Sequence, residues 1–410
     1  MNDTVKVVLS GRMLVALLMG FSSGLPLLLT GSVLQAWMTD EGVDLGTIGL
    51  FALVGLPYTL KFLWAPLVDR FTLPLLGRRR GWLILIQACL MLAIAMLGWT
   101  HPAQNALPVA LAALLVTFFS ASQDIVIDAY RREALVDREL GLGASLYVNG
   151  YRVGMLLASG GGLILADFIP FPQVYQLMAM VMLVGIGTTL FAPEPEAVQG
   201  LPTTLKEAVV HPFIDYFKRH HAWLILLFIL LFKVGDTMAS HMTVPFYLDI
   251  GFSKSEIGTV VKLFGFWATL AGGLIGGIVM LRIGIYRALW GFGILQAVST
   301  AGFAVLAMTG YSLPMLAAVI AFENLSGGMG TAAFVAFMAS LTNRRFTATQ
   351  YALLTSLMGI PRVIVAAPTG YMAASFGWTG FFVFCTLIAL PGLLLLTRFR
   401  GWLAEPDRAD

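Results

Sequence analysis

A row of polar side chains in the first half of the sequence has the residue types and the spacing to bind and pass protons. Thr117, Ser120, Asp124, Asp128 and Arg131 recur every three or four residues, so on an α-helix they share one narrow face. The surrounding sequence is apolar enough to cross a bilayer, where lipid penalises each ionised side chain by a few kcal/mol. The row must therefore face protein or water, and it is typical of proton or substrate relays.

Arg152, on the next apolar segment, could reach toward these carboxylates at a similar depth. A carboxylate in a low dielectric favours protonation, whereas a neighbouring guanidinium favours ionisation. The separation of Asp124 and Arg152 would then control when Asp124 binds a proton. The alternative is a permanent Asp124–Arg152 bridge that only locks two helices together, and in that case Glu323 or Asp236 would carry the proton.

The composition excludes a soluble protein. Of 410 residues, 58% are hydrophobic and only 11% are charged, and the mean hydropathy is +0.85. A soluble domain carries about 25% charged residues, so this chain is a polytopic membrane protein. Cys89 and Cys385 lie far apart in apolar segments, which indicates neither a disulfide nor a metal site. The loops lack a glycine-rich phosphate motif and a nucleophile–base pair, so neither an ATP-driven pump nor an enzyme is indicated, and no cofactor is expected.

Twelve apolar segments are long enough to cross about 30 Å of hydrocarbon. Their approximate limits are 13–38, 45–67, 81–99, 107–130, 140–166, 174–191, 222–249, 254–281, 287–309, 312–341, 347–375 and 378–398. We predict an all-α integral membrane protein with two six-helix bundles (1–191 and 222–410) joined by a hydrophilic linker (192–221). The linker has an apolar face broken by Pro212, which predicts two short helices on the membrane surface.

Basic residues are distributed unevenly between the two sides of the predicted bundles. The side that holds both termini carries nineteen lysines and arginines, whereas the loops of the opposite side carry one, Lys254. Because cytoplasmic loops are enriched in lysine and arginine, we predict that both termini are cytoplasmic.

The remaining basic residues lie within the predicted spans together with four acids, which indicates a polar pathway through the membrane. The charged residues of the spans are Lys61, Arg152, Lys233, Lys262, Arg362, Asp124, Asp128, Asp236 and Glu323. At 1.5 Å per residue, Asp128 and Lys61 lie within about 3 and 10 Å of the predicted cytoplasmic boundary, where local pairing or snorkelling accounts for them. Most of the others lie nearer the midplane, where transporters usually bind their cargo.

The second half of the sequence contains the candidate cargo site. Lys233 and Asp236 are three residues apart and share a helix face, and Lys262 lies at a comparable depth on the following span. We expect all three to line a central cavity in which Lys233 or Lys262 contacts carboxylates of the cargo. Together with Glu323 and Arg362 they sum to +1 when ionised, which suits an anionic cargo. Further side chains could hydrogen-bond to a sugar or stack on it, and these are Gln35, Trp37 and Asn324.

The loop after the second predicted span has a pattern that resembles the loop signature of the major facilitator superfamily. Its charged residues are Asp69, Arg70, Arg78, Arg79 and Arg80. An Asp–Arg pair and helix dipoles could brace the helix ends there and form a conformational latch that opens in one state of a transport cycle. The equivalent loop in the second half has Leu281 in place of the acid, so only one latch is complete.

Over nearly all of its length the sequence resembles the AmpG-type muropeptide permeases of Gram-negative inner membranes, which belong to this superfamily. The matching stretches are Gly20-Phe-Ser-Ser-Gly-Leu-Pro26, Leu34-Gln-Ala-Trp-Met38, Lys61-Phe-Leu-Trp64, Gly77-Arg-Arg-Arg-Gly-Trp82, Ser122-Gln-Asp-Ile-Val-Ile-Asp128, Gly150-Tyr-Arg152, Ala222-Trp-Leu-Ile-Leu226, Lys233-Val-Gly-Asp236, Phe322-Glu-Asn-Leu-Ser-Gly-Gly-Met-Gly330 and Ala348-Thr-Gln350. As a set they are specific, whereas Ser122–Asp128 alone is also similar to acetyl-CoA transporters. Some members of the family continue into two further spans, whereas this sequence ends soon after its twelfth predicted span.

The resemblance implies import of GlcNAc–1,6-anhydroMurNAc peptides into the cytoplasm, driven by the proton gradient, for peptidoglycan recycling and β-lactamase induction signalling. It adds Tyr151 to the expected cargo contacts, and the candidates for proton coupling are Asp124, Asp128, Arg152 and Glu323. The expected partners are the cargo, protons and membrane lipid, without metal or nucleic acid, and the expected state is a monomer. The alternatives are a transporter of another anionic metabolite such as acetyl-CoA, a proton-coupled exporter, and a membrane receptor that binds muropeptide without moving it.

Overall fold

The structure, a computed structural model, describes residues 7–73, 76–196, 204–218, 221–253, 256–365 and 368–399, and all elements in these ranges are helices. Eight helical runs are long and apolar enough to cross a membrane: Gly11–Asp40, Arg78–Gly98, Ala106–Ala134, Phe171–Phe191, Ala222–Asp249, Ile257–Thr309, Leu313–Ser340 and Thr369–Phe399. A further apolar run, Leu53–Leu63, is shorter. The chain is therefore a multi-pass helical membrane protein, as its composition predicted.

Glycine and proline interrupt several of the predicted spans. The segment predicted as span 45–67 contains Gly55 and Pro57 and is divided into short helices joined by 3₁₀ turns. The segments predicted as the eighth and ninth spans form one helical run that is kinked at Gly284, where φ is +76°. The count of twelve spans and the cytoplasmic location of both termini stay predictions.

The chain forms two compact units. Unit 1 comprises Met1–Tyr216 and Ala339–Ser356, and unit 2 comprises Phe217–Met338 and Leu357–Asp410. The segment Ala339–Ser356, from the second half of the sequence, thus packs with the first half. No sequence pattern indicated this assignment, and the predicted bundle boundaries at residues 191 and 222 stay predictions.

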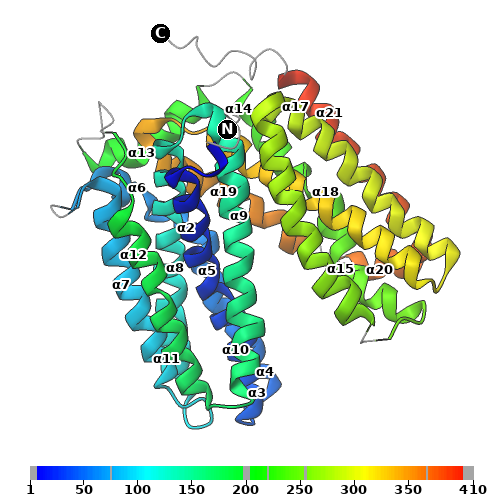
Figure 1. Ribbon diagram of the computed structural model, residues 1–410, viewed down its shortest axis with the longest axis horizontal. Coiled ribbons are helices and arrows are strands. Elements are labelled where there is room, and N and C mark those ends of the chain that lie inside the picture. Colours follow the sequence, from blue (N-terminus) through cyan, green and yellow to red (C-terminus); the bar gives the residue numbers. More distant parts are fainter. Residues whose placement is uncertain are drawn as a thin grey trace. The chain divides into compact units, whose positions relative to one another are not determined.

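Unit 1 contains the helices drawn from blue to green in Figure 1, together with the first turns of α19. They are α2 (Gly11–Leu28), α3 (Leu34–Asp40), α4 (Leu45–Leu50), α5 (Leu56–Leu60), α6 (Ala65–Arg70), α7 (Arg78–Gly98), α8 (Ala106–Ala134), α9 (Leu140–Leu156), α10 (Gly162–Ala166), α11 (Phe171–Val181), α12 (Leu183–Phe191), α13 (Leu205–Phe217) and α19 (Thr347–Ile364). Two π-helical turns, Leu29–Val33 and Leu157–Gly161, interrupt the first and fifth predicted spans.

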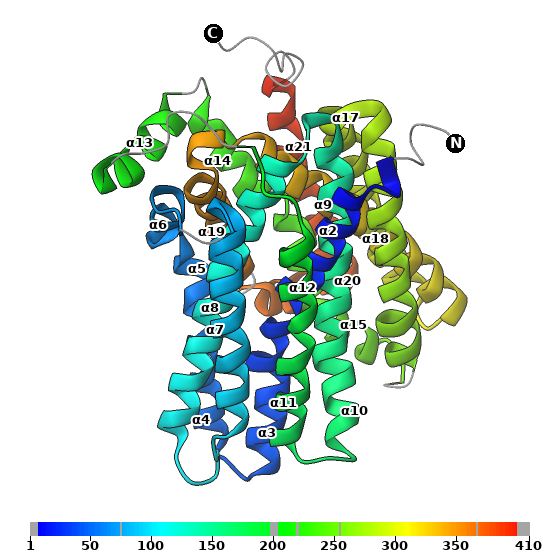
Figure 2. The same cartoon turned by 60° about the vertical axis from the view of Figure 1, so that its left-hand side comes forward.

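Helices α2 and α9 run side by side in both views (Figures 1 and 2) because glycines replace larger side chains between them. A Cβ atom at Gly20 or Gly24 of α2 would lie 2.1 or 2.0 Å from a backbone carbonyl oxygen of α9. A Cβ atom at Gly150 or Gly154 of α9 would lie 2.0 or 2.3 Å from a carbonyl oxygen of α2. These glycines therefore permit close helix packing, which places the polar residues of α2 and α9 next to each other.

We expect Gly24→Ala to lower the free energy of unfolding by about 1–3 kcal/mol, because α2 and α9 must separate to admit the methyl group. Gly187→Ala is the matched control, since Gly187 lies in α12 and an added Cβ would meet no atom within 4 Å. That change is expected to be neutral or slightly stabilising. Thermal unfolding of both variants in detergent measures the difference, and equal unfolding midpoints would contradict the close packing.

Unit 2 is built from α14 (Ala222–Leu231), α15 (Val234–Asp249), the π-helix Ile257–Phe264, α17 (Gly265–Thr309), most of α18 (Leu313–Ser340), the end of α19, α20 (Thr369–Ile388) and α21 (Leu390–Leu395). Glycines again bring two helices together. A Cβ atom at Gly272 of α17 would lie 2.1 Å from the Leu325 carbonyl oxygen, and one at Gly328 of α18 would lie 2.3 Å from that of Thr269. The polar side chains of α17 and α18 can therefore meet.

Part of the predicted linker forms a helix, and the two short helices on the membrane surface stay a prediction. Helix α13 (Leu205–Phe217) continues through Pro212, which has no backbone N–H group to donate to the helix. The Asp215 carboxylate accepts hydrogen bonds from Gln350 Nε2 at 2.7 Å and from Asn343 Nδ2 at 3.1 Å. These bonds fasten α13 to the Ala339–Ser356 segment within unit 1.

Candidate functional site

Asp124 lies at the centre of a buried polar chain that joins three helices of unit 1. It is 7% exposed and belongs to α8. Its carboxylate accepts a short hydrogen bond from the hydroxyl of Ser23 on α2. The hydroxyl of Tyr147 on α9 donates to Ser23 Oγ at 3.2 Å. The close packing of α2 and α9 thus positions two hydroxyl groups in series beside one carboxylate.

The polar face of α8 is turned into protein over its whole length, as its spacing predicted. Thr117, Ser120, Asp124, Asp128 and Arg131 are all buried. The hydroxyl of Thr117 donates to the Val54 carbonyl at 2.6 Å, and the Tyr58 hydroxyl donates to Ser120 Oγ at 2.9 Å.

Lys61 is a buried cation of this site that the sequence placed near the membrane boundary. It is 6% exposed, and it interacts electrostatically with both Asp124 and Asp128. Burial is possible because two carboxylates offset the cost of removing one ammonium from water. Of the two arrangements expected of Lys61, snorkelling and local pairing, its burial beside these carboxylates supports local pairing.

Asp128 is paired on its own helix. Its carboxylate contacts Arg131 Nη2 at 3.1 Å. The same guanidinium donates to the Tyr351 hydroxyl at 2.9 Å and lies 4.5 Å from the centre of the Tyr147 ring. Aromatic faces stabilise a cation, so Arg131 is held by one carboxylate and two tyrosines.

Arg152 and Tyr151 lie on α9 and are both half-buried. The Tyr151 ring centre lies 6.2 Å from that of Tyr147, which places it beside the polar chain. Ser23 and Lys61 are partners of Asp124, and pairing of Asp124 with Arg152 stays a prediction.

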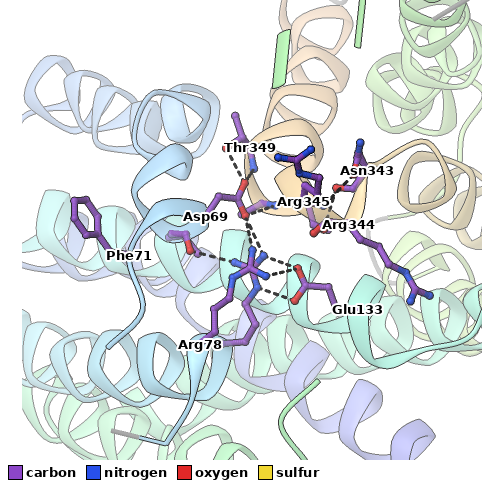
Figure 3. Close-up of polar contacts among 12 residues, drawn as sticks. Asp69, Phe71, Arg78, Glu133, Asn343, Arg344, Arg345 and Thr349 are labelled. Carbon is purple, nitrogen blue, oxygen red and sulfur yellow. Dashed lines mark hydrogen bonds and ion pairs between the residues drawn. The ribbon is translucent and has the colours of Figure 1, made fainter. Parts of the chain in front are cut away.

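The candidate latch is a compact cluster around Asp69 (Figure 3). The Asp69 carboxylate lies 2.9 Å from Arg79 Nη2 and 3.3 Å from Arg78 Nη2. It also accepts the backbone N–H of Thr349 at 2.9 Å, that of Ala348 at 3.3 Å, and the Thr349 hydroxyl at 2.8 Å. Asp69 therefore caps the start of α19 and pairs with two arginines at once.

Arg79 is the buried centre of this cluster. Its side chain is fully buried, and it contacts Glu133 Oε1 at 2.5 Å in addition to Asp69. Glu194 caps the first turn of α7, because its two carboxylate oxygens accept the backbone N–H groups of Arg79 at 2.7 Å and Arg80 at 3.0 Å. The residue before α7 is Gly77, with φ of +93°, and a Cβ there would lie 2.7 Å from the Glu194 carboxyl carbon.

The other two arginines of the predicted latch have different surroundings. The Arg80 guanidinium donates to the carbonyl oxygens of Thr189 at 2.9 Å and Leu190 at 2.6 Å, where a cation complements the carboxyl end of α12. The Arg70 guanidinium lies 5.3 Å from the centre of the Phe71 ring. The buried ion-pair cluster is thus centred on Asp69, Arg78 and Arg79, and its role as a latch stays a prediction.

A second polar cluster lies in unit 2 and contains the predicted Lys233–Asp236 pair. Lys233 Nζ contacts Asp236 Oδ2 at 3.4 Å, Gln296 Oε1 of α17 at 3.1 Å and Thr331 Oγ1 of α18 at 3.3 Å. The Lys233 side chain is 17% exposed and that of Asp236 is 30% exposed. The Gln296 side chain fits here only because residue 330 is glycine: a Cβ atom at Gly330 would lie 2.6 Å from Gln296 Oε1.

Glu323 of α18 belongs to the same cluster. The Ser299 hydroxyl donates to Glu323 Oε2 at 2.5 Å, and Ser326 Oγ donates to Ser299 Oγ at 2.8 Å. The Glu323 carboxyl group also interacts electrostatically with Asp236 and Lys233. Glu323 thus belongs to the same cluster as Lys233 and Asp236, although it is far from both in sequence.

The remaining candidates for cargo binding are spread over both units. Lys262 is exposed on the π-helix Ile257–Phe264, and it has no ion pair with any residue that the structure describes. Asn324 bridges α17 and α18, since it accepts from the Thr269 hydroxyl at 2.8 Å. Gln35 is exposed on α3, and the Arg362 side chain lies outside what the structure describes.

Trp37 lies in the hydrophobic core of unit 1. It is 2% exposed, and its indole stacks on Phe171 with ring centres 5.9 Å apart. Its Nε1 donates to Glu41 at 3.3 Å. These contacts favour a packing role for Trp37 over sugar stacking.

Sequence reasoning missed several partners of the site residues. The candidates did not include five residues that contact them in the structure: Ser23, Tyr147, Glu133, Glu194 and Gln296. The signal for Ser23 was its place in the Gly20–Pro26 stretch, and the signal for Glu133 was an acid directly after Arg131 and Arg132. Neither signal identifies a partner without the tertiary structure.

Comparison with known proteins places this chain among transporters. Residues 13–312 match the family model of the Major Facilitator Superfamily. The "Anhydromuropeptide permease" of Escherichia coli K12 is 48% identical over 387 residues, which cover 94% of this chain and 79% of the relative. A Rickettsia bellii protein that carries the name AmpG 1 is 33% identical and covers 95% of this chain and 98% of its own length.

Solved structures of low sequence identity share the fold. The human organic anion transporter MFSD10 has a TM-score of 0.66 at 17% identity and covers 97% of this chain and 100% of its own. The proton:xylose symporter XylE, bound to 6-bromo-6-deoxy-D-glucose, has a TM-score of 0.70 at 11% identity and covers 97% of this chain and 95% of its own. At such identities the likeness concerns the fold alone.

Proposed function

Because this chain belongs to the AmpG-type muropeptide permeases of the major facilitator superfamily, we propose that it imports GlcNAc–1,6-anhydroMurNAc peptides into the cytoplasm by proton symport. The observation that carries this proposal is the 48% identity, over 94% of the chain, with the Escherichia coli anhydromuropeptide permease. The protein acts as a monomer in a Gram-negative inner membrane, and its cargo serves peptidoglycan recycling and β-lactamase induction signalling.

The cluster in unit 2 supports a cargo that carries carboxylates. Lys233 is held by Asp236, Gln296 and Thr331 and still keeps part of its side chain exposed. Lys262 is an exposed cation. A muropeptide offers hydroxyls, amides and carboxylates, and such groups suit a site of amides, hydroxyls and ammonium groups.

We expect Lys233→Gln and Lys262→Gln each to weaken cargo binding about tenfold, which corresponds to the loss of one charge-assisted hydrogen bond of about 1.5 kcal/mol. The folded yield should stay near that of the wild type, since glutamine keeps a polar side chain of similar length. Binding of labelled muropeptide to purified protein measures the affinity. Unchanged affinity together with collapsed expression would show that the lysines serve only as structural ion pairs.

The cycle that we propose is alternating access, in which two six-helix bundles rock about a central site. Asp69 supports a latch for this cycle, because its partners come from both halves of the sequence: Arg79 on α7 and the first N–H groups of α19. In this proposal the start of α19, which packs with unit 1 here, moves away from Asp69 in another state and breaks the bonds to it. The latch would therefore stabilise the state in which Asp69 is bonded to α19, and these bonds would be broken in the other state.

Asp124 is the carboxylate that we propose to couple proton binding to this cycle. Its hydrogen bond reaches across to α2 and its electrostatic partner is Lys61. A change in the distance to a cation changes the proton affinity of a carboxylate, so rocking of these helices would bind and release a proton. Arg152 is the further cation that could approach Asp124 in another state.

Uptake into proteoliposomes tests the function as a whole. With a proton gradient, labelled GlcNAc–1,6-anhydroMurNAc peptide is expected to accumulate inside, and unlabelled acetyl-CoA is expected not to compete. Binding without accumulation would identify a receptor instead of a transporter. Competition by acetyl-CoA would identify a broader carrier of anionic metabolites.

A further inference from the structure

A small cavity of unit 1, here called the Arg131 cavity, lies near the predicted cytoplasmic ends of α2, α8 and α9. Its wall includes Arg12 and Met19 of α2, Arg131 of α8, Leu135, and Tyr147 of α9. Its volume of about 10 Å³ is near the least that holds a water molecule, so it admits a group as small as one oxygen atom. Among the described residues that line it, two are arginines and none is acidic. The cavity therefore suits an oxygen atom that carries negative charge.

Arg131 has hydrogen-bond donors beyond those that its known partners use. Its side chain is 3% exposed, and its Nη2 atom bonds both to Asp128 at 3.1 Å and to the Tyr351 hydroxyl at 2.9 Å. Its Nε and Nη1 atoms are buried and form no hydrogen bond with any residue that the structure describes. A buried donor without an acceptor costs about 1–3 kcal/mol, and more when the group is charged. These N–H groups therefore favour an acceptor oxygen that enters from outside the protein.

A second cavity adjoins the first and gives it access to solvent. It has a volume of about 230 Å³ and shares Arg12, Ala134 and Leu135 with the Arg131 cavity. The Arg12 side chain is 45% exposed, and its guanidinium contacts Glu139 at 3.2 Å. A ligand can thus place one anionic group beside Arg131 while the rest of it occupies the larger cavity.

The larger cavity carries charges of both signs. Two of its three glutamates are already bonded, Glu133 to Arg79 at 2.5 Å and Glu194 to the first N–H groups of α7. Glu196 and Arg344 are exposed. A peptide, with its amide donors and acceptors, suits such a lining better than a molecule with several phosphates does. The ligand that fits both cavities is therefore a peptide with a carboxylate.

We infer that the Arg131 cavity is a carboxylate-binding site of unit 1, which receives a carboxylate of the cargo before its release to the cytoplasm. The inference rests on the proposed function and adds a contact to those proposed for Lys233 and Lys262. The carboxylate accepts a hydrogen bond from Nε or Nη1 of Arg131, and Arg12 attracts it from the larger cavity. Asp128 keeps its bond to Nη2, so Arg131 does not have to leave its partner. No covalent bond is made or broken.

The first test needs no cargo and uses formate, the smallest carboxylate. The width of the NMR line of isotope-labelled formate measures its saturable binding to purified protein, and all proteins compared carry Lys233→Gln and Lys262→Gln so that unit 2 does not mask the signal. Arg131→Lys keeps the charge without Nε and Nη1, and Ala16→Val fills the cavity beside an unchanged Arg131. We expect each to weaken formate binding about tenfold. Arg282→Gln, which changes an exposed arginine of unit 2, is the control and should leave the affinity unchanged.

Two results of the formate test would overturn the site whether or not the protein transports muropeptide. One is equal affinity with and without the cavity substitutions. The other is no saturable binding even when the cavity is intact, which would show that it takes water only. The two substitutions act independently, one on the donors and one on the space, so Ala16→Val decides the matter if Arg131→Lys does not fold.

The second test links the cavity to the cargo. Arg131→Lys alone is expected to weaken binding of labelled GlcNAc–1,6-anhydroMurNAc peptide about tenfold, whereas a cargo with amidated carboxylates should bind this variant and the wild type equally. An equal loss of affinity for both cargos would show a structural effect and overturn the contact. Unchanged muropeptide affinity in Arg131→Lys would overturn the contact and leave the proposed function standing. No muropeptide binding by the wild type would overturn the function, and the formate test would still decide whether the cavity binds carboxylates.

Discussion

Asp124→Asn is expected to abolish proton-driven accumulation of labelled muropeptide while leaving energy-independent exchange of cargo intact. Asparagine keeps an oxygen that accepts the Ser23 hydroxyl bond, so the contact between α8 and α2 survives. It cannot bind a proton, and it cannot attract Lys61 as a charge. Protonation would then no longer favour one orientation of the carrier, and the inside-to-outside ratio of cargo should fall to about 1.

Proteoliposomes allow both activities to be measured on one preparation, uphill uptake with a proton gradient and counterflow without it. Asp40→Asn is the control, because Asp40 is an exposed acid at the end of α3. Normal uphill uptake by the Asp124→Asn variant would show that Asp124 does not couple proton binding to transport. Loss of both activities would indicate the permanent structural bridge instead.

Arg79→Gln is expected to lower the free energy of unfolding by about 3–5 kcal/mol, the cost of leaving buried charges without their partner. The Arg79 side chain is completely buried, between Asp69 at 2.9 Å and Glu133 at 2.5 Å. Without its guanidinium, two buried carboxylates would face each other. Arg78, which lies 3.3 Å from Asp69 and 3.7 Å from Glu133, offsets only part of this cost.

Arg70→Gln is the matched control in the same loop. Its guanidinium lies over the Phe71 ring, so its removal should change the free energy of unfolding by no more than about 0.5 kcal/mol. The midpoint of thermal unfolding in detergent compares the two variants with the wild type. Equal midpoints for Arg79→Gln and Arg70→Gln would show that the buried cluster does not stabilise the protein.

The sequence alone determined the class of the protein and the most polar face of its first half. High hydropathy with few charges left only a helical membrane protein, because a bilayer requires every backbone polar group to be bonded within a helix or a barrel. The spacing of Thr117, Asp124 and Asp128 placed them on one face of α8, and all three are buried. Helical periodicity is local, so it can be read without knowledge of the fold.

Tertiary structure alone decided which groups meet across helices. Glu133 is bound by Arg79, which is 54 residues away, and Thr349 binds Asp69 from 280 residues away. The sequence allowed Lys61 either to snorkel or to pair locally, and in the structure it is buried and interacts with Asp124 and Asp128. Such pairings depend on how helices pack, and in this chain glycines at the helix contacts set that packing. The sequence indicates that a charge within a membrane span needs a partner, but which residue becomes that partner depends on how the helices pack.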